Sequence, residues 1–205
     1  SCIKVYSQHN QGLGSARNTG IRHSTGHYLM FVDGDDFVEP NSLGSVIKRA
    51  KEMDLDVLRY NYLELNEKHK IIQKTENFIS TIFFKDDVIN GIKYLSERMG
   101  WTCYVILYLF RSSLIKDGNF IFEKGIFFED VEWLPRVLVS AKRVSTIDVH
   151  VYNYIRRSGS ITMNQSNENY IKLINDRIKV IERIRDWKDH INDVKVQKWI
   201  DGINT

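Results

Sequence analysis

The sequence predicts an α/β fold in which helices flank a mostly parallel sheet. Apolar runs typical of strands alternate along the chain with segments whose apolar residues recur at helical spacing. The run Tyr28–Val32 ends abruptly in Asp33, which is typical of a strand that stops at the ligand-binding edge of such a sheet. A strand-like segment, Ile3–Tyr6, and a helical segment precede this run, and the order implies parallel strands joined by a right-handed crossover.

The acidic run Asp33–Asp36 follows the apolar run directly. Gly34 lets the backbone turn sharply, so three carboxylates can gather at one place. Unpaired carboxylates repel one another, and hard divalent cations prefer oxygen ligands, so the run indicates a cation site. A solvated turn explains the same four residues about equally well, because Asp and Gly are common turn residues. An EF-hand is excluded, because Val38 and Gly44 occupy the positions that need Gly and Glu.

A polar loop with several glycines, Gln8–Ile21, runs into a helix of small residues. The glycines allow close backbone approach, and Arg17 adds a cation near the same edge of the sheet. The loop lacks both the dinucleotide fingerprint G-x-G-x-x-G and the Gly-Lys-Ser/Thr of phosphate loops. A nicotinamide enzyme and an ordinary nucleoside triphosphatase are therefore disfavoured.

Further elements follow from periodicity and end signals. We predict a helix from Pro40 to about Met53, a strand over Asp56–Leu65, a polar turn over Asn66–Lys70, a helix capped by Asp86 that ends at Arg98, a buried strand over Trp101–Phe110, strands over Arg143–Tyr154, an amphipathic helix over Glu168–Trp187 and a shorter helix within Asp189–Thr205. The aromatic residues of 101–110 could alternatively form a stacking platform for bases or sugars. We expect a catalytic domain over residues 1–163, followed by a helical segment over 164–205.

Composition narrows the classes of function and location. A net charge of +3 and a pI near 8.7 suit anionic small molecules or loose contact with a membrane surface, but not nucleic acid. Cys2 and Cys103 are too few for a disulfide framework and match no metal spacing, which favours a reducing compartment. No apolar run approaches the ~20 residues of a spanning helix. We expect a cytoplasmic protein, with peripheral contact at the inner face of the membrane left open. The amphipathic helix 168–187 could pack on the core, a partner or a membrane, and core packing is the simplest reading.

A second junction between apolar residues and acids lies at Phe128–Glu132. Because Pro135 is best tolerated in the first turn of a helix, we expect that helix to begin near Val131 and to end at Ala141. Asp130 would then lie at or just before the N-cap, and helix capping explains it more simply than catalysis does. A basic segment, Arg156–Ser160, could likewise clamp phosphate oxygens or be a solvated loop.

The ordered set of these features resembles glycosyltransferase family 2, a family of inverting, nucleotide-sugar-dependent enzymes with the GT-A fold. Four segments carry the resemblance: Asn10–Ile21 is similar to N-x-G-x-x-x-A-R-N-x-G, Asp33–Asp36 to the D-x-D motif, Phe128–Glu132 to the E-D motif, and Tyr152–Thr162 to the closing segment of tyrosines, Arg and Gly-Ser-Ile. Ile155 departs from that last pattern, because an additional Arg is common there. Together the segments cover about residues 3–162.

The resemblance implies a role for each residue of the donor site. Asp33 would hydrogen-bond the ribose or sugar, and Asp35, with Asp33 beside it, would ligate Mn²⁺ or Mg²⁺ bridging the diphosphate. Asp36 would support the loop, and Arg17 would face the base or the diphosphate. Arg157 and Ser160 would close over the phosphates.

The resemblance also implies the catalytic groups and the reaction. Asp130 would deprotonate the acceptor hydroxyl, and Glu129 would orient it. The implied reaction moves a sugar from a nucleotide-sugar, a UDP-sugar by family frequency, to a glycan or glycolipid hydroxyl in bacterial surface polysaccharide synthesis. Two alternatives stay open: a metal-dependent nucleotidyl or phosphoryl transferase, and a non-catalytic nucleotide-sugar-binding module. Release of a nucleoside monophosphate would favour the first, and binding without turnover the second.

Family members open with two strands and an acidic stretch that holds the nucleotide base, and neither pattern occurs in the sequence shown. We therefore expect roughly 50 further N-terminal residues in the natural protein, enough for two strands and a crossover. Without them the predicted strand at Ile3–Tyr6 would expose its edges, which invites strand exchange between two copies and hence a homodimer.

Overall fold

The computed structural model describes residues 3–74, 87–100, 102–157 and 166–202. Its strands are β1 (Tyr28–Met30), β2 (Phe37–Val38), β3 (Val57–Asn66), β4 (Ile71–Lys74), β5 (Tyr108–Arg111) and β6 (Val144–Arg156). Its helices are α1 (Leu13–His23), α2 (Leu43–Glu52), α3 (Gly91–Glu97), α4 (Ser112–Asp117), α5 (Glu129–Ser140), α6 (Asn167–Lys188) and α7 (Val194–Gly202), with a 3₁₀ turn η2 (Val105–Leu107).

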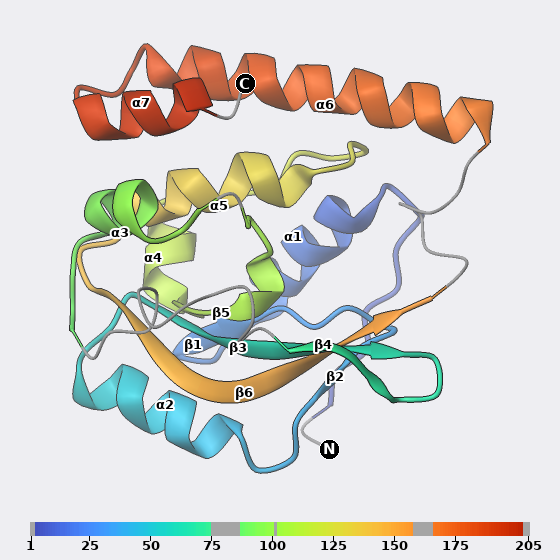
Figure 1. The fold of residues 1–205 in the computed structure, drawn as a ribbon, viewed down its shortest axis with the longest axis vertical. Coiled ribbons are helices and arrows are strands. Elements are labelled where there is room, and N and C mark those ends of the chain that lie inside the picture. Colours follow the sequence, from blue (N-terminus) through green and yellow to red (C-terminus); the bar gives the residue numbers. More distant parts are fainter. Residues whose placement is uncertain (1–2, 75–86, 101, 158–165, 203–205) are drawn as a thin grey trace.

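The elements form layers around one curled sheet, as Figure 1 shows. The strand order is β1-β5-β3-β6-β2, and β4 pairs with β3 outside this path. Helices α1, α3, α4 and α5 lie over one face of the sheet, α2 lies over the other, and α6 and α7 form an outer layer above α5. The predicted α/β class is confirmed.

The pairing within the sheet differs from the mostly parallel arrangement that we expected. Among the strands described, only β3 and β6 run parallel, and the other pairs are antiparallel. The parallel pair is long, from Val57 opposite Val144 to Asn66 opposite Arg156. This pair forms the centre of the sheet, because β5 and β4 pair with β3 while β2 pairs with β6.

The predicted strand at Ile3–Tyr6 is wrong. Ile3 and Val5 are 77% and 86% exposed, and residues 3–12 belong to no strand. Within this segment the ring of Tyr6 stacks on His23 at a centroid distance of 3.9 Å, and Nε2 of Gln8 donates to Oγ of Ser15 at 3.2 Å. An extended segment becomes a strand only when a neighbour pairs with its amides and carbonyls, and no described strand runs beside this one.

Several predicted elements are confirmed with shifted ends. The strand predicted over Asp56–Leu65 is β3, and the polar turn after it lies where expected. The helix expected from Pro40 begins at Leu43, and the buried strand expected over Trp101–Phe110 is divided into η2 and β5. The helix expected from Asp86 begins at Gly91 with Asn90 as its cap, and residue 86 lies outside the described residues.

Helix α5 begins at Glu129, two residues earlier than predicted, so that Pro135 lies inside it. Proline there removes a backbone donor that would have bonded the carbonyl of residue 131. Packing outweighs this loss, because Trp133 and Leu134 are fully buried beside it. The ring of Trp133 stacks on Phe122 at 4.3 Å and meets Phe110 of β5 edge-on at 5.3 Å, which ties α5 to the sheet.

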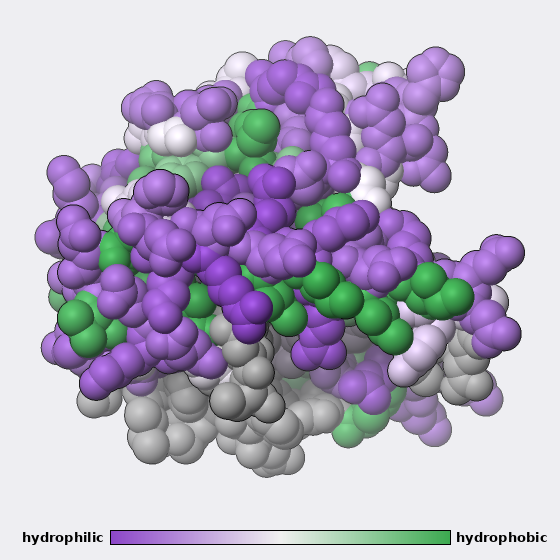
Figure 2. Space-filling view, turned by 90° about the horizontal axis from the view of Figure 1, so that it is seen from above, coloured by the Kyte–Doolittle hydropathy of each residue, from purple (hydrophilic) through white to green (hydrophobic). Residues whose placement is uncertain are grey.

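Core packing of α6, the reading that we preferred, holds for only part of the helix. Val180 and Ile184 are buried, but four large side chains nearer its N-terminus are exposed: Tyr170, Ile171, Ile174 and Ile178. Figure 2 shows hydrophobic residues in a band across this outer layer. None of the described helices is long and apolar enough to cross a membrane.

Helix α1 approaches the segment before α5 so closely that one glycine is required. A Cβ on Gly14 would lie 2.4 Å from the carbonyl oxygen of Glu123, whereas a Cβ on Gly20 of the same helix would meet nothing within 4 Å. We expect Gly14→Ala to lower the free energy of unfolding by about 1–3 kcal/mol through overpacking. Gly20→Ala should raise it by about 0.5–1 kcal/mol, because alanine favours the helix. Urea unfolding of both variants checks the pair, and equal effects would contradict the close approach.

Candidate active site

Arg17 links the two acidic junctions of the sequence. It projects from α1, is only 8% exposed, and lies between the loop after β1 and the start of α5. Its Nη1 lies 2.5 Å from Oε1 of Glu129, and its Nη2 lies 3.1 Å from Oδ1 of Asp33. Acids 96 residues apart in sequence thus share one guanidinium, as the fork geometry of arginine allows.

Strand β6 holds the loop that follows β1. Tyr152 donates its hydroxyl proton to Oδ2 of Asp36 at 2.7 Å and accepts the backbone N–H of Asp33 at 3.1 Å. The backbone N–H of Ile155 donates to Oδ1 of Asp36 at 2.8 Å. Burial raises the pKa of Asp36, these hydrogen bonds partly offset the rise, and the charges of Asp35 and Asp33 add to it. Asp36 is thus a structural support of the loop.

Asp35 points its carboxylate toward solvent from the same loop. It is about half exposed, and its nearest cation is Arg157, whose Nε lies 3.8 Å from Oδ2. Nη2 of Arg157 donates to the backbone carbonyl of Asp35 at 3.3 Å. The structure therefore places Arg157 beside the acidic loop, while Ser160 lies outside the described residues.

The acidic loop fits a divalent cation only if a ligand completes its coordination. Within the described residues, no group of three or more His, Cys, Asp or Glu side chains is arranged to hold a metal ion. Asp33 gives one oxygen to Arg17 and Asp36 gives both to protein donors, so Asp35 remains the accessible carboxylate. Burial is the main cause of the raised pKa of Asp36, and the negative charges of Asp35 and Asp33 add to it, so carboxylates are concentrated in this loop. Phosphate oxygens of a diphosphate would supply the remaining ligands.

Glu129 and Asp130 open α5 directly after a residue in an unusual backbone conformation. Phe128 has φ 63° and ψ 29°, a left-handed conformation that is uncommon for a bulky side chain. Because the helix starts after Phe128, Asp130 is its second residue and the predicted capping role is wrong. Its Oδ1 instead accepts the adjacent N–H of Val131 at 2.9 Å.

The two acids have raised pKa values for related reasons. Burial raises the pKa of Glu129, and the neighbouring Arg17 partly opposes the rise. For Asp130, burial and then the charge of Glu129 raise the pKa to about 7, against the smaller opposing effect of Arg17. A carboxylate that titrates near neutral pH suits general-base catalysis, because its conjugate acid then holds a proton strongly enough.

Helix α6 anchors the segment that leads into these acids. Asp176 is almost fully buried and accepts the backbone N–H of Phe127 at 3.1 Å. Lys172 donates to Asp176 and also to the carbonyl of Gly125, the latter at 2.8 Å. Burial opposes the charged form of Asp176, but the hydrogen bonds from Lys172 and Phe127 outweigh it and lower the pKa. Together these contacts hold the left-handed turn before Glu129.

Sequence reasoning assigned no role to Tyr152 or Asp176. Each had a local signal, since Tyr152 belongs to a strand that follows the predicted helix after Asp130, and Asp176 shares one helical face with the buried Val180 and Ile184. An acid on an otherwise apolar face indicates a specific partner.

Comparison with known proteins identifies the family. The family model described as glycosyl transferase family 2 matches residues 1–110, which is more than half of the chain. This chain belongs to glycosyltransferase family 2.

Bacterial relatives share this assignment. The chain is 31% identical over 162 residues to an uncharacterized glycosyltransferase, EpsJ, of Bacillus subtilis, covering 78% of this chain and 46% of the relative. It is 30% identical over 207 residues to the uncharacterized glycosyltransferase YibD of Escherichia coli, covering 92% and 57%. It is 29% identical over 170 residues to a cholesterol galactosyltransferase of Borreliella burgdorferi, covering 79% and 47%. The chain spans about half the length of these relatives.

Solved structures agree on the fold. The S. aureus TarS structure in complex with UDP-GlcNAc superposes with a TM-score of 0.61 at 20% identity, covering 85% of this chain and 47% of that one. The fold of this family 2 glycosyltransferase is therefore GT-A, as the sequence indicated.

The ion pairs of Arg17 with Asp33 and Glu129 lead to a prediction about stability. Arg17→Met should lower the free energy of unfolding by about 3–5 kcal/mol near pH 8, because it leaves Glu129 buried without its cation. The pKa of Glu129, already raised, should rise further in this variant. A group whose pKa is raised by folding stabilises the folded state at low pH, and this stabilisation is lost as pH rises. The stability deficit of Arg17→Met should therefore shrink toward pH 5.

Arg22→Met on the exposed side of the same helix provides the matched control and should change stability by no more than about 0.5 kcal/mol. Urea titrations at both pH values measure the effect. A deficit for Arg17→Met that does not depend on pH would contradict the coupling with Glu129.

Proposed function

We propose that this protein is an inverting glycosyltransferase that moves a sugar from a nucleotide-sugar, a UDP-sugar, to a hydroxyl of a glycan or glycolipid. The observation that carries the proposal is Asp130, a carboxylate with a pKa near 7 that adjoins the Arg17 link to the acidic loop. The UDP-GlcNAc complex of a protein with the same fold supports the donor class.

In the proposed reaction, ionised Asp130 takes the proton of the acceptor hydroxyl while that oxygen attacks the anomeric carbon. The new carbon–oxygen bond forms on the side opposite the leaving diphosphate, so the configuration inverts as the old bond to the phosphate oxygen breaks. Glu129, held by Arg17, orients the acceptor hydroxyl beside Asp130. The proton ends on Asp130, and the nucleoside diphosphate departs with the bonding electrons.

The donor side uses the acidic loop and its basic neighbours. Asp35, with Asp33 beside it, would hold Mn²⁺ or Mg²⁺, which would offset the charge that develops on the leaving diphosphate. Asp33 also binds the ribose or sugar, and Asp36 keeps the loop in place through Tyr152. Arg157, already at the loop, closes over the phosphates together with Ser160.

The other readings of the sequence lack a comparable observation. A nucleotidyl or phosphoryl transferase would use the acidic loop but would not require a second pair of acids linked to it. A binding module would not require a carboxylate with its pKa raised to about 7. The named relatives reported above are all described as glycosyltransferases.

The acceptor, the location and the assembly stay predictions. A relative described as a cholesterol galactosyltransferase supports a lipid acceptor, and the exposed apolar residues of α6 support peripheral contact with the cytoplasmic face of a membrane. Surface polysaccharide synthesis as the setting stays a prediction as well, and the relatives support only a bacterial glycosyltransferase. The prediction of a homodimer depended on a strand at Ile3–Tyr6, and the structure has no strand there.

Metal-dependent donor binding tests the acidic loop. Asp35→Asn should abolish Mn²⁺-dependent binding of UDP in calorimetry and leave the melting temperature of the free protein nearly unchanged, because Asp35 is half exposed. Asp36→Ala should instead lower the melting temperature, because Tyr152 and Ile155 lose their acceptor. Unaltered Mn²⁺-dependent binding in the Asp35 variant would remove the metal assignment.

Turnover and stability together test the base. Asp130→Asn should lower transfer by roughly 10²–10⁴-fold while donor binding is kept. The pKa of Asp130 is about 7 in the folded state and about 3.9 in the unfolded state. Protonation of Asp130 therefore stabilises the folded state, and this contribution is complete below about pH 4. This contribution is lost as pH rises through about 7.

The variant should therefore lack this loss of stability between about pH 4 and pH 7. Asp117→Asn, an exposed acid at the end of α4, serves as control and should keep both activity and the wild-type pH profile. Full activity per folded molecule in Asp130→Asn would leave Asp130 with a structural role only.

A further inference from the structure

Helix α6 lies outside residues 1–110, the part of the chain that the family model matches, yet a row of its charged side chains follows the segment that leads into α5. Lys172, Asp176 and Arg183 recur at helical spacing and so share one face of α6. Nη2 of Arg183 lies 2.8 Å from Oε2 of Glu123 in that segment, and its Nε lies 3.8 Å from Oε1 of Glu132 in α5. The face is therefore turned toward the chain that carries the proposed base.

Asp176 makes the central contact of this row. It is 1% exposed, its Oδ2 accepts the backbone N–H of Phe127 at 3.1 Å, and Lys172 and Lys179 donate to its two oxygens, Lys179 at 3.2 Å. Lys172 also donates to the carbonyl of Gly125 at 2.8 Å and lies 4.6 Å from the centre of the Phe127 ring. The two lysines offset the charge of the carboxylate, so Asp176 can remain ionised although it is buried. An ionised acceptor binds a backbone N–H more strongly than a neutral one does.

Helix α1 holds the beginning of the same segment. The side chain of Asn18 is buried, donates to the carbonyl of Phe122 at 2.8 Å and accepts the N–H of Phe122 at 2.8 Å. The backbones also lie close together just before α1, because a Cβ on Gly12 would be 3.3 Å from Cα of Gly125. Helices α1 and α6 therefore fix the two ends of the segment, and the only residue left between it and α5 is Phe128.

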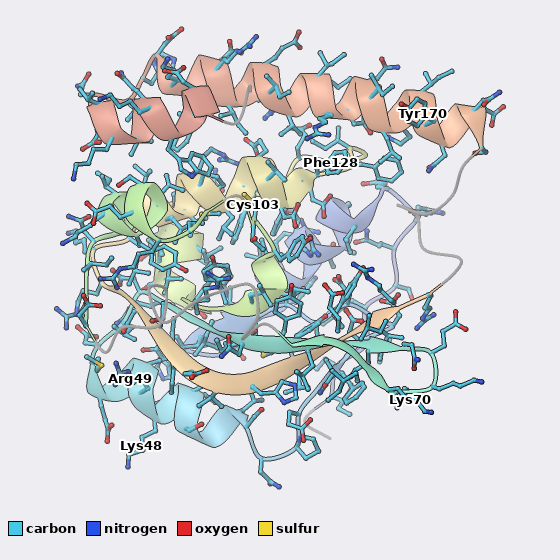
Figure 3. All side chains as sticks on the ribbon, viewed as in Figure 1. Lys48, Arg49, Lys70, Cys103, Phe128 and Tyr170 are labelled. Carbon is cyan, nitrogen blue, oxygen red and sulfur yellow. The ribbon has the colours of Figure 1, made fainter. Side chains whose placement is uncertain are left out.

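Phe128 connects these anchors to the acids. Figure 3 shows it at the start of α5, on the side of α6, and its φ of 63° is left-handed. This conformation costs a bulky residue free energy and persists only where the surrounding structure imposes it. Glu129, which pairs with Arg17 at 2.5 Å, comes next, and Asp130 follows. A return of Phe128 to a right-handed conformation would turn the start of α5 and move both acids.

We propose that Asp176 is a positioning residue for the transfer reaction: through the backbone N–H of Phe127 it imposes the left-handed turn at Phe128 that sets the direction of Asp130. The inference rests on the proposed function for the role of Asp130 as the base. Displacement of a reacting group by about 1 Å can cost about 10²-fold in rate. The acidic loop is held separately, by Tyr152 of β6, so loss of Asp176 should slow turnover without weakening donor binding.

Turnover and donor binding, measured side by side on the whole chain, test this role. Release of UDP from UDP-glucose, UDP-galactose and UDP-N-acetylglucosamine, with water as the acceptor, gives kcat, and calorimetry with UDP and Mn²⁺ gives donor affinity. Asp176→Ala should lower kcat per folded molecule by roughly 10–10²-fold and keep the affinity for UDP within about twofold. Asp176→Asn should retain most of the turnover, because its carboxamide oxygen can still accept the N–H of Phe127.

Two variants of the same helix separate positioning from a loss of stability. Val180→Ala removes buried contacts one turn further along α6, so it should lower the melting temperature, as Asp176→Ala also should, but keep kcat per folded molecule. Glu182→Ala removes an exposed acid of α6 and should change neither quantity. Amide hydrogen exchange of Phe127, followed by NMR, needs no substrate and should be faster in Asp176→Ala than in Val180→Ala.

The outcomes distinguish this inference from the proposed function. An active wild type whose kcat is unchanged in Asp176→Ala, or is lowered equally in Val180→Ala, would overturn the positioning role and leave the proposed function standing. Turnover in Asp176→Asn no higher than in Asp176→Ala would also overturn it. A wild type that releases UDP from none of the three sugars would overturn the proposed donor, and equal exchange rates at Phe127 in Asp176→Ala and Val180→Ala would overturn the anchoring of the turn.

Discussion

The site depends on one buried guanidinium. Arg17 is the cation that lets Glu129 remain charged below the surface, and the same side chain fixes Asp33 of the acidic loop. An isolated buried carboxylate would take up a proton, so the ionisation of one acidic junction depends on the residue that also orders the other. Gly14 makes this possible, because it lets α1 approach the segment before α5 without a side chain in between.

The pKa of Asp130 follows from this arrangement. The positive charge of Arg17 is shared by Glu129 and Asp33, so it only partly offsets burial and the repulsion from Glu129 at the adjoining carboxyl. The start of a helix normally favours a charged carboxylate, but here burial is the larger effect. The protein thus holds an acid in an environment that destabilises its charged form, as catalytic groups commonly require.

Two supports outside the motifs keep the site in shape. Tyr152 ties the acidic loop to β6, and Asp176 ties the turn before Glu129 to α6. Both bond backbone N–H groups, which fixes where the loops run rather than how a single side chain points. Helix α6 therefore helps to hold the site in shape, although the exposed apolar side chains nearer its N-terminus are not part of the core.

The sequence by itself determined the family and the positions of the acids that form the candidate site. The junctions at Asp33 and Glu129, the helix that carries Arg17 and the strand β3 could all be read from local order and period. The fold class followed from the same patterns, because the spacing of apolar residues that are close in sequence distinguishes helices from strands. Only the tertiary structure decided that Ile3–Tyr6 forms no strand and that α6 buries only part of its apolar face. It also decided that Arg17 bridges both acids and that Asp130 titrates near 7. Strand pairing, burial and charge repulsion depend on residues brought together from distant parts of the chain, and no local pattern encodes them.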